Sequence, residues 1–167
     1  VYGFDISPAM LSVAGQELRR GSASNWALAA ADHRNLPLPP DSADLIVSGW
    51  SLCYLALDQE EPWREPLREV FGRLEQLLRP GGMIIILETM GTGFTSPNPP
   101  DFMLDYFSFL DELGFQSRWI RTDYEFESAQ EAETLTRFFF GDALAGQVKA
   151  SGSQILPECT GIWWLRL

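Results

Sequence analysis

The first eleven residues constrain the fold of this chain more than any other stretch. Residues 1–4 are mostly apolar and lead into Asp5, and a helix start follows at once. Ser7 suits a helix N-cap, and Pro8 suits the first helical position, where its missing N–H would have no partner anyway. We therefore expect Asp5 at the carboxyl end of a strand, the edge where open parallel sheets bind ligands. Its carboxylate can accept two hydrogen bonds from a ribose diol there, although helix capping alone would also explain it.

Two further strands are expected in the first third of the chain. Residues 26–31 form an apolar run that ends at Asp32 and His33, which repeats the arrangement at Asp5. Residues 43–48 have the composition of a fully buried strand. Because strand–helix–strand units form right-handed crossovers between parallel strands, the carboxyl ends of these strands should meet at one edge of a sheet.

Strands and helices alternate along the rest of the chain. A helix, an uninterrupted β-prone run and a Gly/Pro/Ser-rich loop of functional length come first, and two helices and two strands follow. The expected helices are residues 63–78, 102–113 and 128–140, and the expected strands are residues 83–87, 115–121 and 160–167. The loop covers residues 91–100.

This alternation predicts one α/β domain over residues 1–167. The expected fold is Rossmann-like and doubly wound, with helices and sheet in three αβα layers. Strands near residues 1–4, 26–31, 45–47 and 83–87 should lie parallel in a single sheet, with 83–87 away from its edges. The late strand at 160–167 should run antiparallel.

Composition limits the partners of the chain. Its formal net charge of −11 disfavours nucleic acid, because the phosphate backbone would be repelled. No apolar run approaches the ~20 residues that span a membrane, so no membrane partner is expected. Without a secretion signal, Cys53 and Cys159 indicate reduced thiols in the cytoplasm, and they lie too far apart in sequence for a metal motif. The sequence gives no indication of the oligomeric state.

Candidate ligand-binding residues gather at the predicted carboxyl edge. Asp5 and Asp32 end neighbouring strands, so one carboxylate can take ribose hydroxyls while the other takes the exocyclic amine of adenine. Apolar walls beside them and the end of the third strand complete the group. The predicted nucleoside-binding residues are Asp5, Ile6, Asp32, His33, Ser48, Gly49 and Trp50.

The order of these pieces resembles the class I S-adenosylmethionine-dependent methyltransferases. The matching segments are residues 1–11, 31–37, 41–47 and 77–82. Beyond Thr89 the resemblance rests on element order, since the family carries a helix and a terminal β-hairpin there. It implies S-adenosylmethionine as cofactor, S-adenosylhomocysteine as product, and in-line transfer of the sulfonium methyl group to a small-molecule acceptor.

One part of the family pattern has no counterpart in the sequence. The first strand and the glycine-rich loop that holds the methionine part of the cofactor should lie before Val1, and no strand here leads through a G-x-G motif into a helix. We therefore expect a methyltransferase-like domain that is incomplete at its N-terminus. The strand ending at Asp5 would lack its inner neighbour or pair with residues 45–47, at about 1–3 kcal/mol for each buried backbone group left unpaired. The chain alone is expected to be unstable or inactive.

No catalytic residue is predicted, because the sulfonium is already an activated methyl donor and needs mainly correct positioning. A general base is needed only for a protonated acceptor, and the single histidine, His33, suits adenine contact better. Residues 90–101 could form a lid over an apolar acceptor. The residues predicted to face the acceptor are Tyr54, Met90, Phe102 and Tyr106.

Two other functions fit parts of the pattern. A methyltransferase-like module that only binds a ligand or partner would need no acceptor chemistry. A nicotinamide-dependent oxidoreductase also binds ribose with an acid after its second strand. Short-chain enzymes of that class need a Tyr-x-x-x-Lys pair, however, and the only lysine, Lys149, has Ala145 four residues before it.

Overall fold

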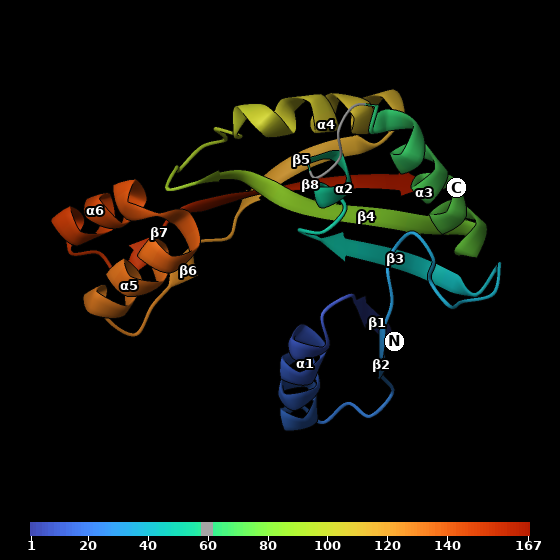
Figure 1. Ribbon diagram of the computed structural model, residues 1–167, viewed down its shortest axis with the longest axis horizontal. Coiled ribbons are helices and arrows are strands. Elements are labelled where there is room, and N and C mark those ends of the chain that lie inside the picture. The colour runs from blue at the N-terminus through green and yellow to red at the C-terminus, as the bar shows by residue number, and fades with distance from the viewer. Residues whose placement is uncertain (58–61) are drawn as a thin grey trace.

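A computed structural model describes residues 1–57 and 62–167 of the chain (Figure 1). Helices and strands alternate nearly as the sequence predicts, and the α/β class is confirmed. In chain order the elements are β1 (Tyr2–Asp5), α1 (Pro8–Arg20), β2 (Ala27–Ala30), β3 (Ala43–Gly49), α2 (Tyr54–Leu57), α3 (Arg64–Leu77), β4 (Leu78–Thr92), α4 (Asp101–Glu112), β5 (Gln116–Arg121), β6 (Tyr124–Glu125), α5 (Ala129–Phe140), α6 (Asp142–Ser151), β7 (Ile155–Leu156) and β8 (Glu158–Arg166).

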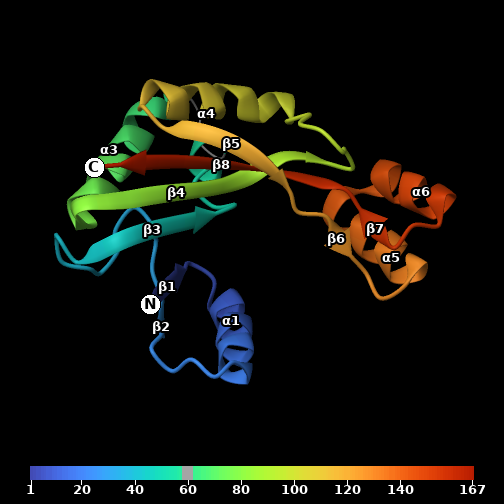
Figure 2. The same cartoon turned by 180° about the vertical axis from the view of Figure 1, so that it is seen from behind.

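The main sheet has the strand order β3-β4-β8-β5. β3 and β4 are parallel, whereas β8 is antiparallel to both β4 and β5. β5 therefore runs in the same direction as β3 and β4, and β8 is the antiparallel strand that the sequence predicts near the C-terminus. β4 lies between β3 and β8, away from the sheet edges, as expected for its apolar run (Figure 2).

β4 is longer than the predicted strand at both ends. It begins at Leu78, directly after α3, instead of at residue 83. The residues after Leu78 form a bulge, because β3 pairs Ala43 with Leu78 and then Leu45 with Met83. The strand ends at Thr92, so the predicted loop starts two residues late.

β1 and β2 form a separate, two-stranded parallel sheet. Within the described ranges β1 pairs with β2 and not with β3, so the expectation of one continuous sheet is wrong at this point, and so is the alternative pairing of β1 with residues 45–47. In both views this pair and α1 lie beside β3, on the side away from β4 (Figures 1 and 2). Leu45 and Val47 on β3 lie on the face of the sheet opposite α3 and α4, and they are 52% and 56% exposed.

The main core lies on one face of the four-stranded sheet, under α3 and α4. Apolar residues at three- and four-residue spacing on both helices meet the buried side chains of Ile84, Ile86 and Trp163. On the opposite face of β4, Ile85 and Leu87 are only half-buried. α1 packs against β1 and β2 and lies with them beyond the β3 edge of this sheet (Figure 1).

Residues 122–157 form a helical insertion between β5 and β8, and in the figures it projects beyond the end of β4 (Figures 1 and 2). α5 begins as predicted, because the Ser128 side chain accepts a hydrogen bond from the Glu131 N–H at 3.1 Å. Ala132, Val148 and Leu156 give the insertion a small core of its own. In the part of the chain that the structure describes, no helix combines the length and hydropathy needed to cross a membrane.

Candidate functional site

Asp5 and Asp32 lie at the same edge of the β1–β2 pair. Asp5 is opposite Ala30 in the parallel register, and its carbonyl oxygen accepts a hydrogen bond from the Ala31 N–H at 3.1 Å. Asp32 follows two residues after Ala30, just beyond the end of β2, so at most about 7 Å of chain separates its Cα from that of Ala30, the residue opposite Asp5. A nucleoside can span a separation of this order.

Asp5 serves the helix start and also faces the sheet edge. Its Oδ1 accepts a hydrogen bond from the Ser7 N–H at 2.7 Å, while the Ser7 hydroxyl accepts from the Met10 N–H at 3.3 Å. The capping interpretation is therefore correct, and it leaves further lone pairs of the carboxylate for a ligand. Ile6, the next residue, is 71% exposed, which puts an apolar side chain beside a carboxylate at the strand end.

Asp32 is engaged by Arg34, a residue that the sequence argument did not single out. The Arg34 side chain donates through Nε to both carboxylate oxygens, at 2.9 and 3.0 Å, and its backbone N–H donates to Oδ1 at 2.8 Å. These hydrogen bonds lower the pKa of Asp32 to about 2, so it stays ionised. Burial lowers the pKa of the adjacent His33, which favours its neutral form. The sequence signal that could have predicted this contact was an arginine two residues after an acid at a strand end.

The turn after β3 carries the third group of candidate residues. Gly49 is opposite Leu87 of β4, and the Trp50 N–H donates to the Leu87 carbonyl oxygen at 2.8 Å. The Ser48 and Ser51 hydroxyl oxygens lie 2.9 Å apart. Trp50 has a φ of 47°, a left-handed conformation that is unfavourable for a bulky residue and needs such support. Its indole is nearly half exposed and offers a flat apolar surface at the strand end.

These residues form two groups in the structure. Asp5, Asp32 and their neighbours belong to the β1–β2 pair, whereas the Trp50 turn belongs to the four-stranded sheet. Within residues 1–57 and 62–167, no strand pairing joins the β1–β2 pair to the four-stranded sheet. That all of them line one pocket therefore stays a prediction.

The residues expected to face an acceptor differ in exposure. Tyr54 and Phe102 are open to solvent, and Met90 is half-buried near the end of β4. Tyr106 is 1% exposed, which argues against its predicted role as an acceptor contact. The reason is its place on the buried stripe of α4, where its ring packs 5.9 Å from that of Phe107.

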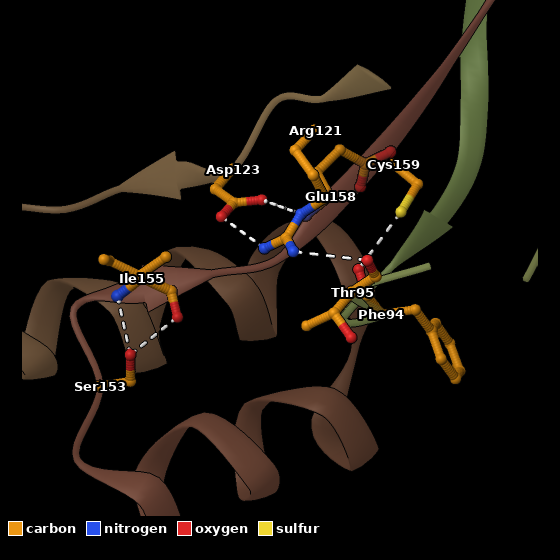
Figure 3. Close-up of polar contacts among 8 residues, drawn as sticks. All are labelled: Phe94, Thr95, Arg121, Asp123, Ser153, Ile155, Glu158 and Cys159. Carbon is orange, nitrogen blue, oxygen red and sulfur yellow. Dashed lines mark hydrogen bonds and ion pairs between the residues drawn. The ribbon is translucent and has the colours of Figure 1, made fainter. Parts of the chain in front are cut away.

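The loop after β4 is attached at several points instead of forming a free lid. Figure 3 shows the Cys159 thiol donating to the carbonyl oxygen of Phe94, and the Arg121 side chain donating to that of Thr95, each at 3.4 Å. The Asn98 N–H donates to the Met90 carbonyl oxygen at 2.7 Å. The loop is thus tied to β4, β5 and β8.

Glu88 is a buried acid that the sequence argument treated only as the end of a strand. It is 0% exposed, and its Oε1 accepts a hydrogen bond from the Cys53 N–H at 3.3 Å. Its Oε2 and the Tyr106 hydroxyl have no hydrogen-bond partner in the described ranges. Burial raises the pKa of Glu88 to about 7 and is also the main reason for the raised pKa values of Cys53 and Tyr106. A single acid closing an apolar run was the signal for this cluster.

Comparisons with known proteins agree with the predicted resemblance. Residues 1–86 match the family model of the methyltransferase domain. Over 105 residues the chain is 28% identical to the arsenite methyltransferase of Halobacterium salinarum, an alignment that covers 63% of this chain and 24% of that protein. The chain thus spans about a quarter of the length of this curated relative. These matches give no support to the nicotinamide-dependent alternative.

Solved structures share the fold at low sequence identity. A candidate methyltransferase from Bacillus halodurans C-125 has a TM-score of 0.56 at 12% identity, over 99% of this chain and 82% of that one. A SAM-dependent methyltransferase from Aquifex aeolicus has a TM-score of 0.55 at 14% identity, over 100% and 69%. Phosphoethanolamine N-methyltransferase 2 from Haemonchus contortus has a TM-score of 0.53 at 17% identity, over 99% and 43%. The chain belongs to the methyltransferase domain family of class I S-adenosylmethionine-dependent methyltransferases and has their α/β Rossmann-like fold.

Proposed function

We propose that this chain is part of an enzyme that transfers the sulfonium methyl group of S-adenosylmethionine to a small-molecule acceptor. The observation that carries the proposal is the pair of carboxylates, Asp5 and Asp32, at one carboxyl edge of parallel strands. Family membership supplies the reaction class, and the Haemonchus relative was crystallised in complex with S-adenosyl-L-methionine.

The residues present suit the nucleoside half of this cofactor. Asp5 has free lone pairs for two ribose hydroxyls, and the exposed Ile6 gives the adenine an apolar wall. Asp32 can accept the adenine amine while it keeps Arg34, since an ionised carboxylate has about four lone-pair sites. The neutral His33 and the Trp50 indole complete the walls. The cofactor supplies an activated methyl group, so these side chains bind and orient it without an obligatory acid or base.

The methionine half of the cofactor needs a further element. We propose that a strand outside these 167 residues pairs with β3 and with the free edge of β1, and that the glycine-rich loop follows it. The separation of β1 from β3 supports this proposal, and so do the exposed apolar side chains of Tyr2, Leu45 and Val47. The domain of residues 1–167 would then be one part of a larger methyltransferase domain.

A small molecule is the proposed acceptor class. The net charge of −11 opposes binding to nucleic acid phosphates. The arsenite and phosphoethanolamine methyltransferases are named for small acceptors. Tyr54 and Phe102 offer exposed aromatic rings for such a molecule. The free thiols of Cys53 and Cys159 support the expected cytoplasmic location.

Calorimetric titration of the full-length protein with S-adenosylhomocysteine tests the cofactor, with NADH as the matched control ligand. We expect saturable binding of S-adenosylhomocysteine and none of NADH. Transfer of a labelled methyl group to a panel of small amines, thiols and arsenite then tests the reaction. Binding without transfer to any acceptor would favour the non-catalytic module, and absence of binding would reject the proposal.

A further inference from the structure

Glu88 and its neighbour Leu87 hold the two ends of one turn. The Leu87 carbonyl oxygen accepts the Trp50 N–H at 2.8 Å, and the Glu88 carboxylate accepts the Cys53 N–H at 3.3 Å. Two consecutive residues of the central strand β4 therefore fix the stretch from Trp50 to Cys53. Tyr54, the first residue of α2, follows directly.

The choice of an acid at this position is unusual. Glu88 shares the α3/α4 face of β4 with Ile84 and Ile86, where an apolar side chain would pack without a desolvation penalty. An amide could also accept the Cys53 N–H at lower cost, because it carries no charge. What only the ionised carboxylate offers is a charge-assisted hydrogen bond, which is about twice as strong as a neutral one.

We propose that Glu88 is a positioning residue, whose carboxylate holds the Cys53 N–H and thereby fixes the turn that presents Trp50 and Tyr54 at the cofactor edge. This inference rests on the proposed function for the role of Trp50, but the contact itself does not. Trp50 needs such support because its left-handed φ of 47° is unfavourable for a tryptophan. When Glu88 is protonated, the hold on Cys53 weakens and the turn can relax.

Among the titratable groups of this cluster, Glu88 is the one that titrates near neutral pH. The thiol of Cys53, from the turn, and the hydroxyl of Tyr106, from α4, face it, and burial raises the pKa of both, so they stay neutral. On the β8 side the opposite residue is Gly161, which has no side chain. Burial raises the pKa of Glu88 itself to about 7.

The test uses the full-length protein and the variants Glu88→Gln and Glu88→Leu. Amide hydrogen exchange of Cys53, followed by NMR, reports the contact without any ligand. After correction for intrinsic exchange, we expect the protection of the Cys53 amide in the wild type to rise between about pH 6 and about pH 8. In Glu88→Gln the protection should be lower and independent of pH. In Glu88→Leu the protection should be lost. Affinity for S-adenosylhomocysteine should follow, with about fivefold tighter binding by the wild type at the higher pH and a flat profile in Glu88→Gln.

Glu88→Gln is the matched control, because it keeps the shape of the side chain, an acceptor for Cys53, and every other titratable group, including His33. Equal Cys53 protection in all three proteins would overturn the proposal, and so would parallel pH profiles of ligand affinity in wild type and Glu88→Gln. If no protein binds S-adenosylhomocysteine while Cys53 protection still depends on Glu88, the contact is supported and the proposed function fails.

Discussion

The Arg34 side chain donates to both carboxylate oxygens of Asp32, at 2.9 and 3.0 Å from its Nε. This ion pair sits at the strand end where the adenine amine is proposed to bind. Both side chains are partly open to solvent, so the pair contributes little to stability, and its main effect is on the ionisation of Asp32.

Replacing Arg34 by Gln should raise the pKa of Asp32 from about 2 toward its ordinary value of 3.8. The Arg34 hydrogen bonds are the largest cause of the low pKa, and the substitution removes the charged ones. Carboxyl chemical shifts followed by NMR through an acid titration would measure the change. Since Asp32 stays ionised at neutral pH in both proteins, affinity for S-adenosylhomocysteine there should not fall. A large loss of affinity would mean that Arg34 itself contacts the ligand.

Replacing Asp5 by Ala should weaken binding of S-adenosylhomocysteine to the full-length protein by about 1–3 kcal/mol, because two hydrogen bonds to a charged acceptor are lost. The fold should survive, since Asp5 is only half-buried and loses one helix-capping contact. Calorimetry measures the affinity and thermal unfolding checks the fold. Asp105→Ala, at an exposed position of α4, is the control and should bind like the wild type. Equal affinities in all three proteins would remove Asp5 from the site.

Glu88 should make the protein less stable as the pH rises through the neutral range. Its pKa is about 7 in the folded protein against an ordinary value of 4.5, so the unfolded chain releases this proton first. Its stabilising contribution is full below about pH 4.5 and is lost as the pH rises to about 7, by roughly 3 kcal/mol in total. Urea unfolding of wild type and Glu88→Gln across this range isolates the effect as a difference. A constant difference between the two proteins would contradict the buried, protonated carboxyl.

Tyr106→Phe tests whether Tyr106 belongs to the core or to the acceptor site. Its buried hydroxyl has no hydrogen-bond partner in the described ranges, so removing it should leave stability unchanged or raise it by up to about 1 kcal/mol. Methyl transfer to whichever acceptor the full-length enzyme uses should keep its KM. Tyr54→Phe, at an exposed neighbour of the Trp50 turn, gives the comparison. A raised KM in Tyr106→Phe alone would restore the acceptor role.

Local signals in the sequence predicted most of the elements and some of their ends. Ser7 and Ser128 both cap helices as expected, because capping depends on a few adjacent residues. The sequence predicted that the strand ending at Asp5 would either lack an inner neighbour or pair with residues 45–47, and the structure shows the first outcome. Local patterns could not decide between the two, because strand pairing depends on contacts distant in the sequence. Periodicity placed Tyr106 on a helix but not on its buried side. Glu88 could have been singled out as an acid that closes an apolar run, but its partner Cys53 lies 35 residues away, so the pattern alone did not reveal the contact.

The final prediction concerns the strand proposed between β1 and β3. Val47 is 56% exposed in residues 1–167, and in the completed sheet it would be covered. Val47→Thr should therefore have almost no effect on the stability of residues 1–167 and should destabilise the full-length protein by about 1–3 kcal/mol, because a hydroxyl would be buried. Ile84→Val is the control: Ile84 is already fully buried, so this substitution should cost about 1 kcal/mol in both proteins.

Calorimetric titration should also show much weaker binding of S-adenosylhomocysteine by residues 1–167 than by the full-length protein. Equal effects of Val47→Thr in both proteins, or equally tight ligand binding by both, would show that no strand completes the sheet there.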